Sequence, residues 1–239
     1  PVRGAHMHRV SDLSAVGLVQ IVETLSLLSW MQEHNPWHNK ANFGVCGISM
    51  GAEIATLLAA VSPIPCHLVA VMPSHSAAAT WNEGVLQYVA DWEHLATIPL
   101  DGKAVVVDDP TAWASDEKLG DEAEADDEVV AEADCHMTTE PLMMTARDAQ
   151  KYAAAWLAHT DIRSLPKPFQ WLDPAARPNI ILIGAVDDQY ISSESVATLA
   201  DYWSDVAELR WISGGHCTGV VFHKETIRQC IADAMFGRM

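Results

Sequence analysis

The stretch FGVCGISMGAEIATLLAA, residues 43–60, joins an apolar run to a Gly-x-Ser-x-Gly pentapeptide and then to an alanine- and leucine-rich segment. This succession predicts a buried strand, a sharp turn and a helix. A serine at such a turn, here Ser49, is held in a strained backbone conformation that points its Oγ out of the sheet. We expect glycine at Gly47 and Gly51 because a Cβ at either position would collide with the neighbouring strand or helix. The stretch favours a nucleophilic serine over one that only caps a helix.

The helix predicted to begin at Met50 adds an electrostatic element to this turn. Its first N–H groups have no partner within the helix, and the positive end of its dipole lies beside Ser49. An oxyanion that forms at the serine would therefore meet the backbone N–H of Met50. Met50 is the oxyanion donor that we predict.

Length and composition predict one α/β domain over residues 1–239. The chain has 239 residues, of which 49% are hydrophobic, so it is long and apolar enough for one sizeable core. We find no apolar stretch of about 18 residues that would span a bilayer, and no signal segment at the start. Five cysteines without Cys-x-x-Cys spacing indicate small apolar residues in a reducing compartment, which favours an intracellular protein.

The net charge of −18 is concentrated in one stretch. Residues 108–134 hold twelve acidic side chains and one lysine, which predicts a solvated, mobile insertion. An acidic surface repels nucleic acid and anionic lipid headgroups, so we expect neither as a partner. His6, His8 and the pair Cys135-His136 lack a second ligand pair at a recognised spacing, so we expect no metal site and no cofactor.

Patterns along the chain predict a parallel sheet covered by helices on both faces. Apolar runs predict strands at 43–48, 67–72, 180–184 and 209–212, and the 3.6-residue period predicts helices between and around them. The predicted helices lie at 11–34, 50–60, 81–95, 138–159, 193–203 and 223–236. In the helix at 81–95 we expect Val85, Tyr88, Val89 and Trp92 to share one face.

Two further polar segments follow strands directly, as Ser49 does. Asp187 and Asp188 come just after the third predicted strand, and Gly214-Gly215-His216 follows the fourth. Because the carboxyl ends of parallel strands meet at one edge of a sheet, these side chains converge on Ser49. A serine, then an acid, then a histidine is the order of a nucleophile, an orienting carboxylate and a general base. Spacing from the preceding glycine favours Asp187 as the acid, and the choice between the two aspartates stays open.

At this point the chain resembles the α/β-hydrolase superfamily, and within it the family around abhydrolase domain-containing protein 18. The resemblance extends from near the start to the terminal helix and leaves out the acidic stretch. The elbow at 47–51 and the Gly-Gly-His at 214–216 are shared widely among hydrolases. The serine-histidine segment at 73–77 and the Asp-x-Tyr-Ile segment at 188–191 are more discriminating. The segments that carry the resemblance are residues 10–13, 47–51, 73–77, 83–86, 160–162, 187–191 and 214–216.

The resemblance implies an α/β-hydrolase fold that lacks its first strands, with residues 75–162 as a helical cap insertion. The family pattern of an acid followed by x-aromatic-aliphatic favours Asp188 as the acid, with Asp187 as the alternative. In the family the elbow strand lies beside a strand that precedes Pro1, and the loop after that strand supplies a second oxyanion N–H. We therefore expect residues 43–48 to form an open apolar edge through which the chain self-associates.

The sequence supports two functions of different classes. The first is a serine hydrolase that cleaves an acyl ester through Ser49, His216 and Asp188, with aromatic cap residues that suit a lipid-like acyl group. His75 and Trp81 are our candidates for its substrate pocket. The second is a non-catalytic binding or scaffold protein that keeps the hydrolase shape without a complete oxyanion hole. An acyltransferase or haloperoxidase on the same three residues is not separated from hydrolysis by sequence.

Overall fold

The computed structural model describes residues 10–34, 43–97 and 145–237, so the acidic stretch 108–134 and the histidines at 6, 8 and 136 lie outside the described residues. The strands in chain order are β1 (Gly44–Ile48), β2 (His67–Val71), β3 (Ile180–Ala185) and β4 (Ala207–Ile212). The α-helices are α1 (Val10–His34), α2 (Met50–Val61), α3 (Ala77–Asn82), α4 (Trp92–Ala96), α5 (Ala146–Leu157), α6 (Ser193–Tyr202), α7 (His216–Phe222) and α8 (Lys224–Phe236). Short 3₁₀ turns are η1 (Val85–Tyr88), η3 (Ala158–Thr160), η4 (Ile162–Ser164) and η5 (Pro174–Ala176).

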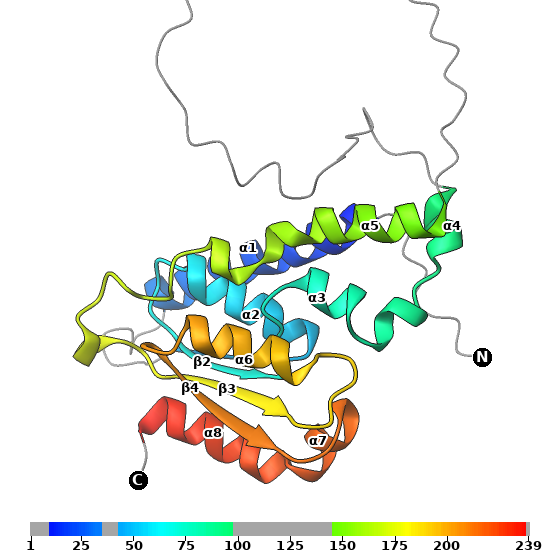
Figure 1. Cartoon of the computed structure of the whole chain (residues 1–239). Coiled ribbons are helices and arrows are strands. Elements are labelled where there is room, and N and C mark those ends of the chain that lie inside the picture. The colour runs from blue at the N-terminus through cyan, green and yellow to red at the C-terminus, as the bar shows by residue number, and fades with distance from the viewer. Residues whose placement is uncertain (1–9, 35–42, 98–144, 238–239) are drawn as a thin grey trace, which may run out of the picture.

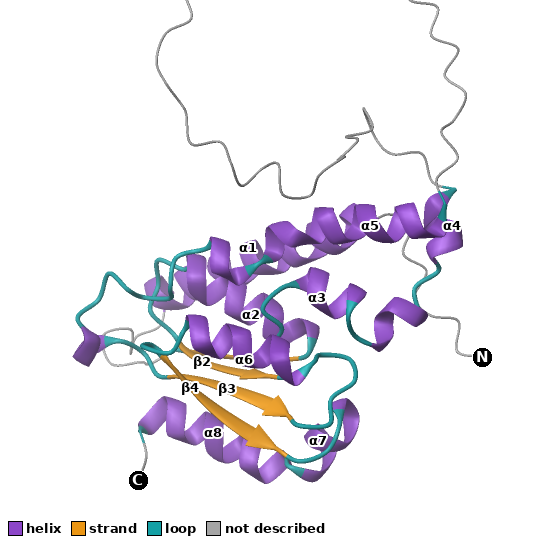
Figure 2. Cartoon of the chain, viewed as in Figure 1, coloured by secondary structure: helices purple, strands orange, loops and turns teal. Residues whose placement is uncertain are grey.

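The described strands form one parallel sheet in the order β1-β2-β3-β4. Each strand returns to the sheet through a helical crossover, as parallel pairing requires. Consequently all the described strands end at the same edge of the sheet, as the parallel arrows of β3 and β4 show (Figure 2). The prediction of a parallel α/β sheet is confirmed.

Alternating side chains of the sheet face two different helical layers. Leu68, Ala70 and Leu182 belong to the core shared with α2 and α6, whereas Val71 and Ile183 belong to the core shared with α8. Helices α2 and α6 lie on one face of the sheet and α8 lies on the other, with α1 and α5 outside α2 (Figure 1). Because both faces are covered, the central strands are apolar on both sides.

Helix α1 departs from the expectation that no stretch is long and apolar enough to span a membrane. The segment Ser14–His34 has 21 residues with a mean hydropathy of 1.4, and only 6% of its most apolar window is buried. The expectation was wrong because it counted uninterrupted apolar runs, whereas the apolar residues of this helix alternate with uncharged polar ones and with the glutamates Glu23 and Glu33. By length and composition alone, the segment passes the test for a spanning helix.

The region predicted as one helix at 81–95 is broken into three short elements. Helix α3 ends at Asn82, Gly84 precedes η1, and the Asp91 side chain caps α4 by accepting the N–H of His94 at 2.9 Å. As a result Tyr88 and Val89 do not share a buried face with Trp92, and they are 81% and 57% exposed. The apolar residues do recur with helical spacing, but Gly84 and the capping Asp91 divide the segment into separate short helices.

The carboxyl end of the fold contains a helix that the sequence patterns missed. Helix α7 begins at His216, directly after the Gly-Gly turn, and ends at Phe222, just before α8. The sequence patterns placed His216 directly after the fourth strand and predicted the next helix only at 223–236. At the other end of the sheet, β1 pairs only with β2 among the described strands, and Cys46 and Ile48 are exposed. The described sheet therefore has an open edge at β1.

Candidate active site

The turn at Ser49 has the strained conformation that the sequence predicts. Ser49 has φ 56° and ψ −124°, a combination that L-residues rarely adopt. Its N–H donates to the Val71 carbonyl at 2.9 Å, which fixes the turn to the end of β2. A Cβ on Gly47 would overlap the carbonyl of Gly51, so glycine is required there by space. The same expectation for Gly51 was wrong, because a Cβ there meets nothing within 4 Å among the described residues.

A continuous chain of hydrogen bonds joins Ser49 to His216 and Asp188. The Nε2 of His216 lies 2.7 Å from Ser49 Oγ, and its Nδ1 lies 2.7 Å from Asp188 Oδ2. The His216 side chain is 15% exposed and the Asp188 side chain 1% exposed. The structure thus brings together a hydroxyl, an imidazole and a buried carboxylate from the ends of three strands, in the arrangement by which an imidazole activates a serine.

Asp188 is held in place by the backbone of its own loop. Its Oδ1 accepts the N–H groups of Tyr190 at 2.8 Å and Ile191 at 3.1 Å, which leaves Oδ2 for His216. Asp187 is exposed, and its N–H donates to the Gly214 carbonyl at 3.1 Å. Of the two candidate acids, the structure brings Asp188 to the imidazole, and Asp187 links the acid loop to the histidine loop through the backbone.

The histidine is positioned by a glycine turn and by the start of α7. Gly214 has φ +88°, a conformation that glycine adopts without steric cost. The Gly215 N–H donates to Thr218 Oγ1 at 2.9 Å, and the Gly215 carbonyl accepts the N–H of Gly219 at 2.7 Å. His216 is therefore fixed at the first position of a helix rather than carried on a free loop.

Met50 begins α2 directly after the serine, and its side chain is 55% exposed. As the first helical residue, it carries one of the N–H groups that an α-helix leaves without an intrahelical partner. The Ser49 carbonyl accepts the N–H groups of Ala52 at 2.8 Å and Glu53 at 3.1 Å, so those donors are turned into the helix. The N-terminal turn of α2 is thus adjacent to Ser49, where negative charge is favoured.

The two pocket candidates, His75 and Trp81, make contacts outside the Ser49–His216–Asp188 chain. The Nδ1 of His75 lies 2.8 Å from the Oγ of Ser195, which also lies 2.8 Å from the Oγ of Ser74. Burial lowers the pKa of His75, and the nearby Asp161 carboxylate opposes that shift. Trp81 packs against the apolar cluster formed by α4 and α5. These contacts tie His75 to α6 and Trp81 to α4 and α5.

Tyr190 is a residue at the site that our reasoning from spacing did not single out. Its ring stacks on the His216 ring with centroids 4.8 Å apart and planes 29° apart. The available signal was the Asp-x-Tyr-Ile pattern at 188–191, which we used only to choose between the two aspartates. Asp188, Tyr190 and His216 form one packed unit.

Glu53 is a carboxyl close to the site that the hydrogen-bond chain does not use. It lies one helical turn after Ser49 and is partly buried. Burial raises the pKa of Glu53 to about 7, and a hydrogen bond from the Thr160 side chain opposes the rise. Near neutral pH this carboxyl is therefore partly protonated.

The raised pKa of Glu53 predicts a pH-dependent stability difference between the wild type and Glu53→Gln. As pH rises from about 4.5, the unfolded chain loses this proton first, so the wild type becomes less stable until about pH 7 and the penalty is constant above that. Glutamine avoids the penalty and should add about 1–3 kcal/mol to the free energy of unfolding at pH 8, but little at pH 4.5. Urea denaturation at both pH values measures this, with exposed Glu93→Gln as control. Equal differences at the two pH values would contradict it.

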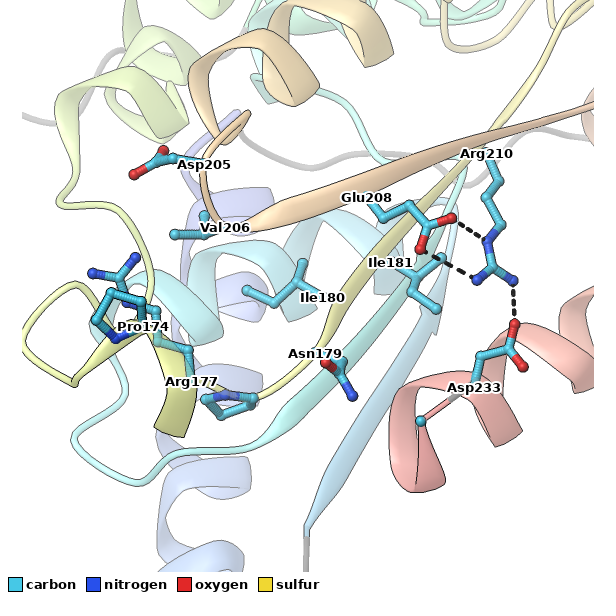
Figure 3. Close-up of a pocket in the computed structure, with 12 residues that line it drawn as sticks. Pro174, Arg177, Asn179, Ile180, Ile181, Asp205, Val206, Glu208, Arg210 and Asp233 are labelled. Carbon is cyan, nitrogen blue, oxygen red and sulfur yellow. Dashed lines mark hydrogen bonds and ion pairs between the residues drawn. The ribbon is translucent and has the colours of Figure 1, made fainter. Parts of the chain in front are cut away.

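A cavity of about 360 Å³ lies at the opposite end of the sheet, near the starts of β3 and β4 (Figure 3). On its wall, the Arg210 guanidinium pairs with Glu208 at 2.9 Å and with Asp233 at 2.6 Å. Neither Ser49 nor His216 lines this cavity. In the parts of the chain that the structure describes, no group of three or more His, Cys, Asp or Glu side chains is placed to hold a metal ion.

Comparison with known proteins gives one family match and several solved structures. The family model described as alpha/beta hydrolase domain containing 18 matches residues 2–236. An esterase from Pyrococcus furiosus is 15% identical with a TM-score of 0.43, and the match covers 90% of this chain and 61% of that chain. A protein described as a non-heme bromoperoxidase from Mycobacterium tuberculosis H37Rv is 19% identical with a TM-score of 0.43, covering 91% and 73%. This chain thus spans less than two thirds of the length of the Pyrococcus esterase.

The family match agrees with the observed fold and covers nearly the whole chain. It includes the serine turn after β1, the acid loop after β3 and the Gly-Gly-His segment after β4. The chain belongs to the α/β-hydrolase family described as alpha/beta hydrolase domain containing 18.

Proposed function

We propose that this hydrolase cleaves an acyl ester by means of Ser49, His216 and Asp188. The observation that carries the proposal is the unbroken hydrogen-bond chain from Ser49 Oγ through both imidazole nitrogens to the Asp188 carboxylate. A serine hydroxyl is a weak nucleophile unless a base takes its proton as it attacks, and the imidazole lies at the distance that this transfer needs.

In the proposed reaction, Ser49 Oγ attacks the acyl carbon while His216 Nε2 takes the hydroxyl proton. Asp188 accepts a hydrogen bond from Nδ1–H and stabilises the imidazolium that forms. The Met50 N–H stabilises the negative charge on the former carbonyl oxygen. His216 then gives the proton to the leaving alcohol oxygen, which leaves an acyl-enzyme. A water molecule, deprotonated by the same imidazole, releases the acid and restores the serine hydroxyl.

For the substrate we propose a lipid-like ester with an apolar acyl chain. The cap segments on either side of the undescribed residues carry exposed apolar side chains, among them Tyr88 at 81% and Val89 at 57%. Such surfaces suit contact with an apolar ligand. In the proposal the cap, with Trp81 in its apolar cluster, forms one wall of the pocket, and His75, in the segment that follows β2, contributes to another part of its lining.

The test of the proposed function is reaction of the full chain with a fluorophosphonate probe and with p-nitrophenyl esters of increasing acyl length. Labelling requires Ser49 Oγ to attack phosphorus and expel fluoride, so it reports an activated serine. We expect labelling and faster hydrolysis of medium or long acyl esters than of acetate. A folded chain that reacts with none of them would overturn the hydrolase and leave the binding or scaffold protein as the better account.

A second element of the proposal is self-association through the β1 edge. Unpaired backbone groups of an exposed strand pair readily with another chain, and Cys46 and Ile48 on this edge are exposed. We expect size-exclusion chromatography with light scattering to give a dimer or a larger species. Cys46→Lys on β1 should shift it toward monomer, whereas Val221→Lys on exposed α7 should not. A stable wild-type monomer would contradict this element.

A further inference from the structure

Tyr190 contacts both partners of the nucleophile at once. Its backbone N–H donates to Asp188 Oδ1 at 2.8 Å, and its ring lies on the ring of His216 with centroids 4.8 Å apart. The two nitrogens of His216 are engaged by Ser49 and Asp188, so the faces of the ring are what remain to be supported. The Tyr190 ring covers one of those faces.

The first described part of the cap rests on the same short loop. The Val85 N–H donates to the Gln189 carbonyl at 2.8 Å. The backbone of Gly84 lies even closer to this loop, because a Cβ on Gly84 would overlap the Tyr190 carbonyl. Gly84 has φ −84°, which any residue adopts, so the glycine is required by this close approach and not by its conformation. The cap backbone and the acid loop therefore fix each other's position.

We propose that Tyr190 is a positioning residue that holds the His216 ring in its reactive orientation, and that docking of the cap at Gly84 and Val85 holds Tyr190 in place. This inference rests on the proposed hydrolase function. It makes the cap segment 77–96 part of the support of the catalytic base, in addition to any role as a wall of the pocket.

The physical basis is the weak intrinsic preference of a histidine ring. Rotation of the ring about its bond to Cβ is broad, so contacts decide its orientation. The hydrogen bonds to Asp188 and Ser49 define the plane of the ring only while both are made, and the bond to Ser49 is broken and remade during each turnover. A stacked aromatic ring restrains the imidazole throughout. Losing this restraint should affect the chemical step more than substrate binding.

The test compares Tyr190→Ala with Tyr190→Phe in ester hydrolysis by the full chain. Tyr190→Ala is expected to lower kcat about 10–100-fold with KM changed by less than about threefold, because misplacing a reacting group by about 1 Å has an effect of that size. Tyr190→Phe keeps the ring and the backbone N–H, and should restore most of kcat. A purely structural role would lower the melting temperature of Tyr190→Ala without this rescue pattern in kcat.

Three outcomes are distinguishable. A wild type that hydrolyses no ester and takes no fluorophosphonate label fails the proposed function itself. An active wild type with Tyr190→Ala within about twofold in kcat overturns the positioning role while the hydrolase stands. A loss of kcat that Tyr190→Phe does not restore also overturns it, since the aromatic ring would then not be the important group.

The cap contact is tested by Gly84→Ala, with Gly17→Ala as the matched control. A Cβ on Gly17 meets nothing within 4 Å among the described residues, whereas a Cβ on Gly84 displaces Tyr190. Gly84→Ala should lower kcat, and combining it with Tyr190→Ala should add little, because both remove the same support. Fully additive losses would overturn the cap coupling. If Gly84→Ala does not fold, hydrogen exchange at the Val85 amide should be faster in Tyr190→Ala, and an unchanged rate would overturn the coupling.

Discussion

Replacing Ser49 by alanine is expected to abolish fluorophosphonate labelling and to lower ester hydrolysis by about 10⁴-fold or more. Alanine leaves no oxygen at the tip of the turn, so neither the phosphorus of the probe nor the acyl carbon of an ester meets a nucleophile. His216 and Asp188 remain, but in the proposed reaction they act through Ser49 Oγ, which is hydrogen-bonded to His216 Nε2 at 2.7 Å. The measurement is gel fluorescence of the labelled protein together with the initial rate of p-nitrophenol release.

The matched control for this variant is Ser204→Ala, because Ser204 is an exposed serine after α6 and takes no part in the hydrogen-bond chain. It should label and hydrolyse like the wild type. Persistent labelling of Ser49→Ala would mean that the probe reacts elsewhere, and the assignment of Ser49 as nucleophile would be lost. Circular dichroism of both variants shows whether the loss comes from chemistry or from unfolding.

Asp188→Asn is expected to lower kcat by about 10³–10⁴-fold, whereas Asp187→Asn should lower it by less than about threefold. An amide at position 188 carries no negative charge for the imidazolium and can present an N–H to Nδ1, which favours the wrong tautomer of His216. Asp187 is exposed and contributes its backbone N–H to the Gly214 carbonyl, which asparagine retains. Initial rates with one p-nitrophenyl ester at saturating concentration measure both effects.

Asp187→Asn and Asp188→Asn make the same chemical change at adjacent positions, so a difference in kcat between them reports the role of one carboxylate and not a general effect of the substitution. Equal losses would indicate a general effect of the loop, and a larger loss at Asp187 would reverse the assignment of the acid. The rate of fluorophosphonate labelling should follow the same order, since both reactions need the serine proton to be removed.

If the wild type reacts with the fluorophosphonate probe but hydrolyses esters slowly, we expect the cause to be a missing oxyanion donor. The first turn of α2 begins at Met50 and places backbone N–H donors next to Ser49. In other enzymes, removal of a single oxyanion donor lowers the rate by about 10²–10³-fold. A slow but Ser49-dependent enzyme would therefore still agree with the proposal, because labelling and turnover make different demands on the site.

Local patterns predicted much of the fold, because they depend on residues close together in the chain. The apolar run and glycine turn at 43–51 predicted β1, the strained serine and α2, and buried runs predicted the other three strands. Parallel pairing then placed the ends of β1, β3 and β4 at one edge, and with them Ser49, Asp188 and His216. Periodicity was less reliable at residues 81–95, where Gly84 and Asp91 interrupt an apolar pattern that is otherwise helical.

The sequence by itself determined the parallel α/β class and the order of a serine, an acid and a histidine at the strand ends, since strand signals and the Gly-x-Ser-x-Gly turn are local. Residue spacing favoured Asp187 as the acid and the family pattern favoured Asp188, and the tertiary structure decided between them. Asp188 Oδ1 accepts two backbone N–H groups of its own loop and leaves Oδ2 for His216, whereas Asp187 is exposed to solvent. The tertiary structure likewise decided the need for Gly84, which depends on the approach of a carbonyl from a distant loop. Contacts between segments far apart in the chain leave no periodic signal, so they are specified only when the sheet brings those segments together.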